Sequence, residues 1–177
     1  MPTADLHPSP ADRRRSTVSL SYSRSGPTDG AAVILLGSLG SDRSMWDPQV
    51  AALRPRFDVI AVDTRGHGHS PVVDGPYTVA ELAGDVVALL DDLGIERAHI
   101  VGLSLGGAIA QHLAITSPQR IESLVLCCTA ARFGEPQPWL ERAATVRARG
   151  TGAIAAAVVD RWFTPELAGR DPELIAR

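Results

Sequence analysis

Apolar residues gather in short runs along the chain, and most of these runs have almost no polar interruption. Four of them cover residues 32–36, 59–62, 98–101 and 124–127. Continuous apolar strands are buried on both faces, which is typical of a parallel sheet covered by helices. An earlier segment, residues 18–23, alternates apolar and polar positions, and this alternation predicts an edge strand of an antiparallel hairpin.

Helical periodicity appears between these runs. Thr78 and Glu81 form a capping box, and leucine and valine then recur at helical spacing over residues 82–93 until Gly94 ends the segment. Residues 105–117 show a second apolar stripe at helical spacing. Strands that alternate with helices predict the α/β fold class, with a mostly parallel, doubly wound sheet.

The character of the sequence changes after residue 130. A linker interrupted by Gly and Pro is followed by two short amphipathic segments, residues 139–149 and 153–163, and a third helix is expected to start at Asp171. Because that helix would run to the last residue, we expect a truncated chain. We divide the sequence into a disordered leader rich in Pro, Asp and Arg (1–15), the N-terminal part of an α/β core (16–130) and a partial helical lid (131–177).

Composition excludes several classes of protein. The chain has 177 residues, 45% of them hydrophobic, and a net charge of -3, which suits one cored domain and predicts no binding to nucleic acid or to a membrane. The arginines at 13–15 precede a polar stretch rather than the apolar core of a signal peptide. Cys127 and Cys128 are adjacent, and we expect both to be small buried hydrophobes in a reducing compartment. These features predict a cytoplasmic protein.

A serine flanked by glycines follows the third apolar run. Gly102-Leu103-Ser104-Leu105-Gly106 lies between a predicted strand and a predicted helix, which is the nucleophile-elbow pattern. Glycines at both ends allow a turn that exposes the serine side chain in a strained position. Ser104 is therefore the candidate nucleophile, and the backbone N–H of Leu105 is a candidate oxyanion donor.

A second glycine-rich turn follows the first apolar run and precedes a helix-like stretch from Met45. It spans residues 37–41, and its position suits the other half of an oxyanion hole, with the N–H of Leu39 as donor. An ordinary strand-to-helix turn is the alternative. The presence of the elbow favours the oxyanion role.

The partners that would activate Ser104 are not evident. His67 and His69 lie in a loop that lacks both further metal ligands and a dinucleotide fingerprint, and we interpret it as structural, with Asp63 and Arg65 tying strand ends together. His67 precedes the serine, against the chain order usual for an elbow enzyme. His112 lies two turns along the elbow helix, too far to accept the serine proton.

The predicted lid offers only weak candidates. Asp160 and Asp171 fall in helical segments and are expected to be solvated surface residues. Arg132 lies just beyond the fourth apolar run, where it is either a carboxylate clamp for a substrate or a surface arginine. Trp139 and Trp162 are expected to pack within the lid, with pocket lining as the second interpretation.

The combined motifs resemble the α/β-hydrolase superfamily. Residues 38–46, the loop 63–70, the elbow and the stretches around 133–134 and 162–165 are similar to the 3-oxoadipate enol-lactonases. The resemblance implies an α/β-hydrolase fold in which Ser104 opens 3-oxoadipate enol-lactone to 3-oxoadipate, in the β-ketoadipate pathway of aromatic breakdown, without a cofactor or metal.

The resemblance also leaves two alternatives. Family members place the acid and the histidine of the triad after later core strands, beyond the lid, so this chain alone is expected to be weakly active or inactive. One alternative is a silent fragment or binding module that needs a complementing C-terminal segment. The other is a hydrolase of another ester or lactone.

Overall fold

The computed structural model describes residues 17–173, so the leader proposed for residues 1–15 lies outside the described residues. The chain divides into two compact units between Arg132 and Phe133. The first holds β1 (Tyr22–Ser25), β2 (Ala32–Leu36), the 3-10 helix η1 (Arg43–Trp46), α2 (Asp47–Leu53), β3 (Asp58–Val62), α3 (Val79–Asp92), β4 (Ala98–Leu103), α4 (Leu105–Thr116), the 3-10 helix η2 (Pro118–Arg120) and β5 (Ile121–Cys127). The second holds α5 (Pro136–Arg149), α6 (Gly152–Trp162) and α7 (Pro165–Arg170).

The first unit is built on a five-stranded sheet of order β1-β3-β2-β4-β5. Strands β2, β3, β4 and β5 run parallel to one another, and β1 pairs antiparallel with β3. The four apolar runs of the sequence are the four parallel strands. The α/β class with a mostly parallel sheet is therefore confirmed.

The antiparallel edge strand predicted at residues 18–23 is present as β1, but it begins later than predicted and forms no hairpin with the next strand in sequence. The strand begins only at Tyr22, which lies opposite Val62 of β3. Val18 is not in a strand because its amide donates to the carboxylate of Asp85 on α3. Pairing with β2, the next strand in sequence, is blocked because β3 and β4 already occupy both edges of β2. The free edge of β3 remains, so β1 adds there.

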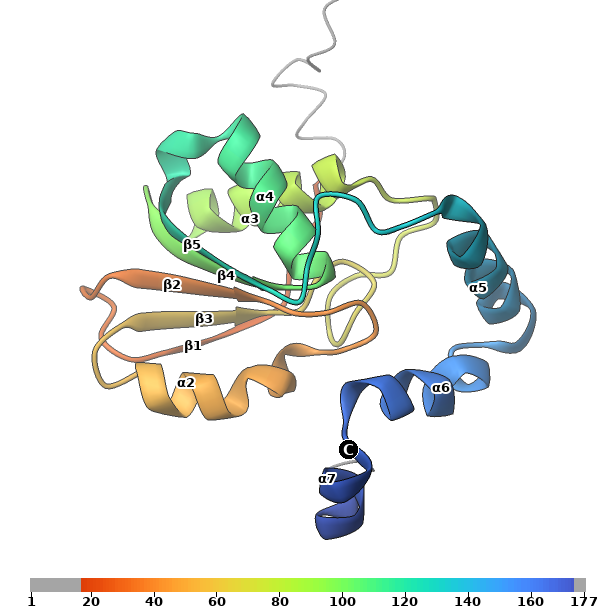
Figure 1. Ribbon diagram of the computed structural model, residues 1–177. Coiled ribbons are helices and arrows are strands. Elements are labelled where there is room, and N and C mark those ends of the chain that lie inside the picture. Colours follow the sequence, from red (N-terminus) through yellow and green to blue (C-terminus); the bar gives the residue numbers. More distant parts are fainter. Residues whose placement is uncertain (1–16, 174–177) are drawn as a thin grey trace, which may run out of the picture. The chain divides into compact units, whose positions relative to one another are not determined.

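Alternate residues of the central strands enter two different cores. On one face, side chains such as Ile34 and Ile100 pack with α3 and α4, and Figure 1 shows both helices on the same side of the sheet. On the other face, Val33 and Leu35 pack with Trp46 and with the partly buried residues of α2. Helices on both faces explain why β2 and β3 are buried along their whole length.

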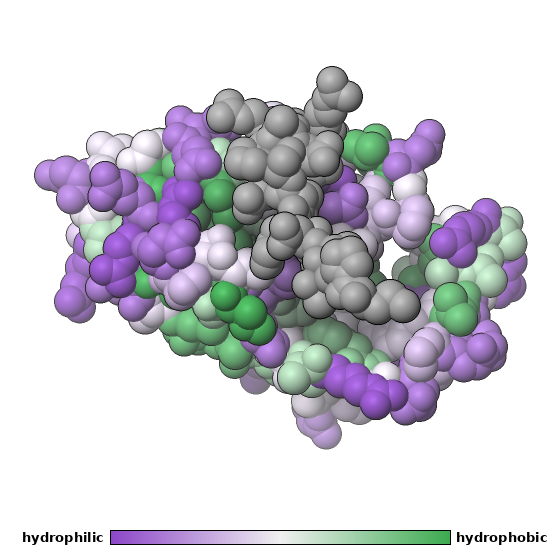
Figure 2. Space-filling model, turned by 90° about the horizontal axis from the view of Figure 1, so that it is seen from above, coloured by the Kyte–Doolittle hydropathy of each residue, from purple (hydrophilic) through white to green (hydrophobic). Residues whose placement is uncertain are grey.

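The fourth apolar run does not behave as predicted, because β5 is an edge strand of the described sheet and is not buried on both faces. Val125 and Leu126 are 48% and 43% exposed. Cys127 is half-buried and Cys128 is exposed, both as free thiols, so the expectation that both are buried is wrong. Figure 2 shows apolar residues reaching the surface among polar ones at several places.

The second unit consists of short helices without a fully buried residue. Two of them match the amphipathic segments at 139–149 and 153–163, although α5 begins three residues earlier, at a Pro suited to a first helical turn. Helix α7 was not predicted from the sequence; Thr164 caps it by accepting from the Leu167 amide. Pro172 and Glu173 are helical, and the rest of the helix predicted from Asp171 lies outside the described residues. None of the helices described is long and apolar enough to cross a membrane.

Candidate active site

Ser104 stands at the sharp turn between β4 and α4. Its backbone angles, φ 52° and ψ -108°, are unusual for a residue with a side chain, and two hydrogen bonds hold it there. The Ser104 amide donates to Cys127 O at 3.0 Å, and Thr129 Oγ1 donates to Ser104 O at 2.8 Å. The hydroxyl does not cap the helix and has no hydrogen-bond partner within residues 17–173. The turn therefore presents an unused hydroxyl group.

The glycines on either side are required by close backbone approach. A Cβ at Gly106 would lie 2.1 Å from Leu36 O, and a Cβ at Gly102 would lie 2.4 Å from Gly106 O. The elbow thus packs directly on the end of β2, where no side chain fits. This explains why a glycine stands two positions before and two positions after Ser104.

The two candidate oxyanion donors lie on segments that are joined by a hydrogen bond. The amide of Gly106, next to Leu105, donates to Gly37 O at 3.0 Å in the loop that carries Leu39. Within the described part of the chain, the backbone amides of Leu39 and Leu105 donate no hydrogen bond. Leu39 is 36% exposed and Leu105 is half-buried. Both amides thus remain available for a ligand.

The loop after β3 supports the loop after β2. Asp63 is fully buried and accepts from the Arg43 amide at 2.7 Å, from the Arg43 guanidinium and from the His69 amide at 3.0 Å. His67 Nε2 accepts from the Gly40 amide at 2.9 Å, and His67 Nδ1 lies 3.1 Å from Arg65 O. Since both ring nitrogens have partners, His67 acts here as part of a structural loop.

Arg65 forms a buried ion pair with Asp85 of α3. Two hydrogen bonds of 2.8 and 2.7 Å join the guanidinium to the carboxylate, and the side chains are 4% and 1% exposed. These hydrogen bonds, more than the charge attraction, raise the pKa of Arg65. Asp63 and Arg65 were expected to tie strand ends together. The Asp63 amide, just past β3, does so by donating to Ser21 O, just before β1, at 2.9 Å. The Asp63 carboxylate in addition binds η1, whereas the Arg65 guanidinium binds α3.

The other predicted residues lie apart from this cluster or in the second unit. His112 is on α4, where its carbonyl accepts from Thr116 Oγ1. Asp160 is on α6 and Asp171 is the residue after α7. Arg132 is exposed at the end of the first unit. Its role as a substrate clamp stays a prediction.

Trp139 is engaged within the second unit. Its indole N–H donates to Phe133 O at 2.7 Å, and its ring meets the Phe133 ring edge-on at 6.3 Å. The Arg142 guanidinium lies 5.8 Å from the Trp139 ring centre. Trp139 is 41% exposed, and its predicted role in substrate binding stays a prediction.

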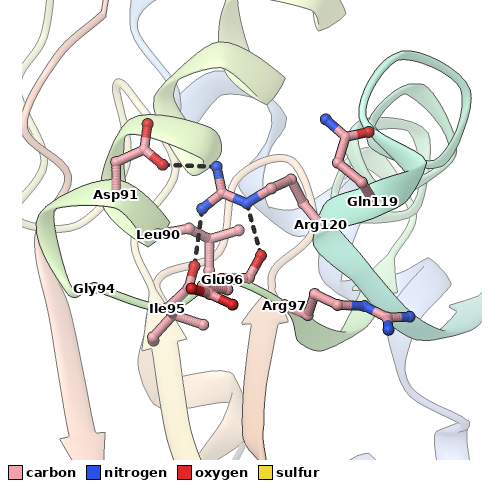
Figure 3. A pocket seen from close by; sticks show the side chains of 8 residues that line it. All are labelled: Leu90, Asp91, Gly94, Ile95, Glu96, Arg97, Gln119 and Arg120. Carbon is pink, nitrogen blue, oxygen red and sulfur yellow. Dashed lines mark hydrogen bonds and ion pairs between the residues drawn. The ribbon is translucent and has the colours of Figure 1, made fainter.

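One hollow lies at the other end of the sheet from Ser104. About 550 Å³ in volume, it is lined by residues that precede β4 and β5, whereas Ser104 follows β4. Figure 3 shows the Arg120 guanidinium bound to Asp91 and to two backbone carbonyls, Ile95 O and Glu96 O. The Arg120 guanidinium thus joins η2 to the end of α3 and to the residues that follow it. We therefore assign this hollow a structural role.

The sequence did not single out Thr129, whose hydroxyl donates to Ser104 O, and did not predict that Gly40 of the loop 37–41 donates to His67. Both follow the carboxyl end of a strand by a few residues, Thr129 after β5 and Gly40 after β2. Carboxyl ends of parallel strands meet at one edge of a sheet, where α/β proteins bind ligands. That rule, applied to every strand, was the signal that could have found them.

A mostly parallel sheet with a strained serine at a strand-to-helix turn is the arrangement of an α/β hydrolase. The family described as "alpha/beta hydrolase fold" matches residues 31–165, and the chain belongs to this family.

Individual relatives are more specific. The chain is 42% identical over 160 residues to 3-oxoadipate enol-lactonase 2 of Acinetobacter baylyi, covering 90% of this chain and 60% of that protein. It is 45% identical over 109 residues to a putative carbamate hydrolase, RutD, of Variovorax paradoxus, covering 60% of this chain and 41% of that protein. The crystal structure of the enol-lactonase from Burkholderia xenovorans LB400 superposes with a TM-score of 0.86 at 47% identity, covering 89% of this chain and 61% of that one. The chain thus spans about 60% of the length of the enol-lactonases it matches.

Proposed function

We propose that the protein is a serine hydrolase that opens a lactone, with Ser104 as the nucleophile. The observation that carries the proposal is the backbone of Ser104, held at φ 52° while its hydroxyl has no partner among the described residues. A strained conformation that the surroundings enforce is a mark of a functional site. A purely structural turn would be built more readily with glycine at this position.

The proposed reaction has two covalent steps. Ser104 Oγ attacks the lactone carbonyl carbon while its proton passes to a base, and the tetrahedral intermediate then breaks the ring C–O bond. An enol-lactone releases an enolate, which takes up the proton held by the base and becomes a ketone. Water then attacks the ester on Ser104 and gives a proton to the base, the bond to Ser104 Oγ breaks, and the base passes that proton to the serine. The acid product leaves as its carboxylate after losing its own proton to solvent.

The two free amides fit the charge that develops in this reaction. The N–H groups of Leu39 and Leu105 would donate to the oxyanion of each tetrahedral intermediate, and each such donor is typically worth about 10²–10³ in kcat. The Gly106–Gly37 hydrogen bond keeps the two donor segments together before the substrate arrives. Such preorganisation makes the donors effective, because they need not reorient during the reaction.

We propose 3-oxoadipate enol-lactone as the substrate, because two relatives that match 90% and 89% of this chain, at 42% and 47% identity, are enol-lactonases. The second candidate is another ester, lactone or carbamate, which the similarity to the putative carbamate hydrolase favours. Arg132 and Trp139 would line the substrate site, with Arg132 binding a substrate carboxylate. In this proposal residues 16–130 belong to the catalytic core and residues 131–177 to the lid.

In this proposal the acid and the histidine of the triad lie outside the described residues. The chain by itself is therefore expected to hydrolyse the substrate only slowly. Elbow enzymes that lack triad members keep a residual acceleration on the order of 10³–10⁴ over water. A complementing C-terminal segment would then raise the rate. Two free thiols side by side fit a reducing compartment, and we propose a cytoplasmic location.

A substrate panel tests the proposal. Turnover of the enol-lactone, an acyl-homoserine lactone, an aryl ester and a carbamate would be compared for the chain and for Ser104→Ala, each with the complementing C-terminal segment added. We expect the enol-lactone to give the highest kcat/KM, and the Ala variant to fall to the residual rate that the oxyanion hole and substrate binding supply without the serine. Equal turnover by the Ala variant would exclude the serine mechanism, and a higher kcat/KM for the carbamate would show that the carbamate, not the enol-lactone, is the substrate.

A further inference from the structure

We propose that His67 is a positioning residue that orients the Leu39–Gly40 peptide, and through it the Leu39 oxyanion donor. The inference rests on the proposed function, because it assigns a role within the same reaction. It differs from a base role, since His67 acts through the loop and never touches the proton of Ser104.

Residues 39 and 40 are otherwise weakly held. Leu39 is 36% exposed, Gly40 has φ +88°, and nothing lies within 4 Å of the position a Gly40 Cβ would take. Neighbouring residues are anchored, because Gly37 O accepts from Gly106 and Ser38 O accepts from both the amide and the hydroxyl of Ser41. In the described part of the chain, the Gly40–His67 bond of 2.9 Å is the hydrogen bond that residues 39 and 40 make.

His67 is itself held firmly. Its amide donates to Thr64 O at 2.9 Å, its carbonyl accepts from the Ser70 amide at 3.0 Å, and its Nδ1 lies 3.1 Å from Arg65 O. Arg65 is fixed in turn by the buried ion pair to Asp85. The His67 ring therefore connects the loop that carries Gly40, through Arg65, to Asp85 on α3.

The contacts also set the tautomer of the ring. A carbonyl oxygen can only accept, so Nδ1 must carry the proton that faces Arg65 O. Nε2 then keeps its lone pair toward the Gly40 N–H. A neutral imidazole protonated at Nδ1 satisfies both neighbours, which is the pattern expected of a ring selected to hold a backbone amide.

Holding the Gly40 amide matters for the Leu39 amide next to it. The Leu39–Gly40 peptide is planar, so fixing its N–H fixes the ψ rotation of Leu39 and limits how its own N–H can point. Because Gly40 has no side chain, its backbone can adopt other conformations once its hydrogen bond to His67 is lost. Oxyanion donors stabilise the transition state only while they point at the developing charge.

Variants of His67 in the full chain separate positioning from packing. His67→Leu removes the acceptor, and we expect kcat on the enol-lactone to fall by about 10-fold to 100-fold with KM nearly unchanged, since one oxyanion donor is worth about 10²–10³. His67→Gln places an amide oxygen within reach of the Gly40 N–H and should restore most of the rate. His69→Leu is the matched control, because the His69 side chain is 79% exposed and only its backbone binds Asp63 at hydrogen-bond distance.

Nuclear magnetic resonance supplies a readout that does not depend on turnover. We expect ¹⁵N shifts of the Nδ1–H tautomer for His67, and amide exchange at Gly40 that is faster in His67→Leu than in His67→Gln. The inference is overturned by an Nε2–H tautomer, by unchanged Gly40 exchange in the Leu variant, or by a Leu variant as active as the Gln variant. Absence of Ser104-dependent turnover in every variant would instead refute the proposed function, and the tautomer and exchange data would still decide the role of His67.

Discussion

The amide of Gly106 donates to the carbonyl of Gly37 at 3.0 Å, and this bond joins the elbow to the loop after β2. Each of the two segments carries one candidate oxyanion donor, Leu105 beside Gly106 and Leu39 two residues after Gly37. The geometry of the proposed oxyanion hole therefore depends on a contact between two glycines. Neither residue could approach so closely with a side chain at Gly106.

Substitution of Gly106 by Ala should destabilise the fold. The new Cβ would lie 2.1 Å from Leu36 O and 2.8 Å from Gly37 O, and both are backbone atoms that cannot rotate away. We expect the free energy of unfolding to fall by about 3 kcal/mol or more, at or beyond the upper end for overpacked interiors. Urea denaturation followed by circular dichroism measures this change.

Gly84→Ala is the matched control, because among residues 17–173 a Cβ there meets only Thr17 Cγ2, at 3.7 Å. It lies within α3, where Ala is favoured over Gly by roughly 0.5–1 kcal/mol. Its stability should be unchanged or higher. Similar losses in both variants would contradict the close approach that we describe at the elbow.

Breaking the buried ion pair should cost more than breaking an exposed one. Asp85→Ala leaves the Arg65 guanidinium buried without its carboxylate, and we expect a loss of about 3–5 kcal/mol. Glu122→Ala removes the partner of Arg97 from a pair whose side chains are 55% and 49% exposed, and should cost less than about 1 kcal/mol. The double change Arg65→Met with Asp85→Leu should recover part of the loss. Thermal and urea unfolding of the four proteins would show whether the buried pair behaves in this way, and equal losses for Asp85→Ala and Glu122→Ala would refute it.

Asp42 should make stability sensitive to acid. It caps η1, and hydrogen bonds from the Ser44 hydroxyl and then the Ser44 amide lower the pKa of its carboxyl below the ordinary value. A carboxyl with a depressed folded-state pKa contributes stability above its unfolded pKa of about 3.9 and loses it as pH falls through the folded value. The free energy of unfolding should therefore drop below about pH 4.

Asp42→Asn isolates this contribution. The amide oxygen can still accept from Ser44 but does not titrate, so the acid-induced loss measured by urea unfolding between pH 5 and pH 3 should be smaller than in the unsubstituted chain. An equal loss in both proteins would show that the Asp42 cap does not contribute to the pH dependence.

Local signals predicted much of the fold correctly. The capping box of Thr78 and Glu81 marked the start of α3, and the uninterrupted apolar runs gave the parallel strands, because both depend on residues close in sequence. The exposure of β5 was not predicted, because it depends on which elements pack beside the strand and not on the residues of the strand itself. The pairing of β1 with β3 was not predicted for the same reason.

The candidate site divides in the same way. Ser104 and its glycines were evident, since the elbow is a contiguous motif. The bonds from Thr129 to Ser104 O and from Gly40 to His67 join residues 25 and 27 positions apart. No sequence periodicity specifies such contacts, which arise only when the carboxyl ends of the strands are brought together.

The reactivity of Ser104 is the central claim, and trapping of its acyl or phosphoryl adduct tests it most directly. The chain, together with the complementing C-terminal segment, would be treated with an activated aryl ester or a fluorophosphonate, and the modified residue would be located by tandem mass spectrometry. We expect an adduct on Ser104 that is lost in Ser104→Ala and reduced when a transition-state analogue that binds the oxyanion hole competes. Modification of another residue, or none at Ser104 while the chain hydrolyses the ester, would contradict it.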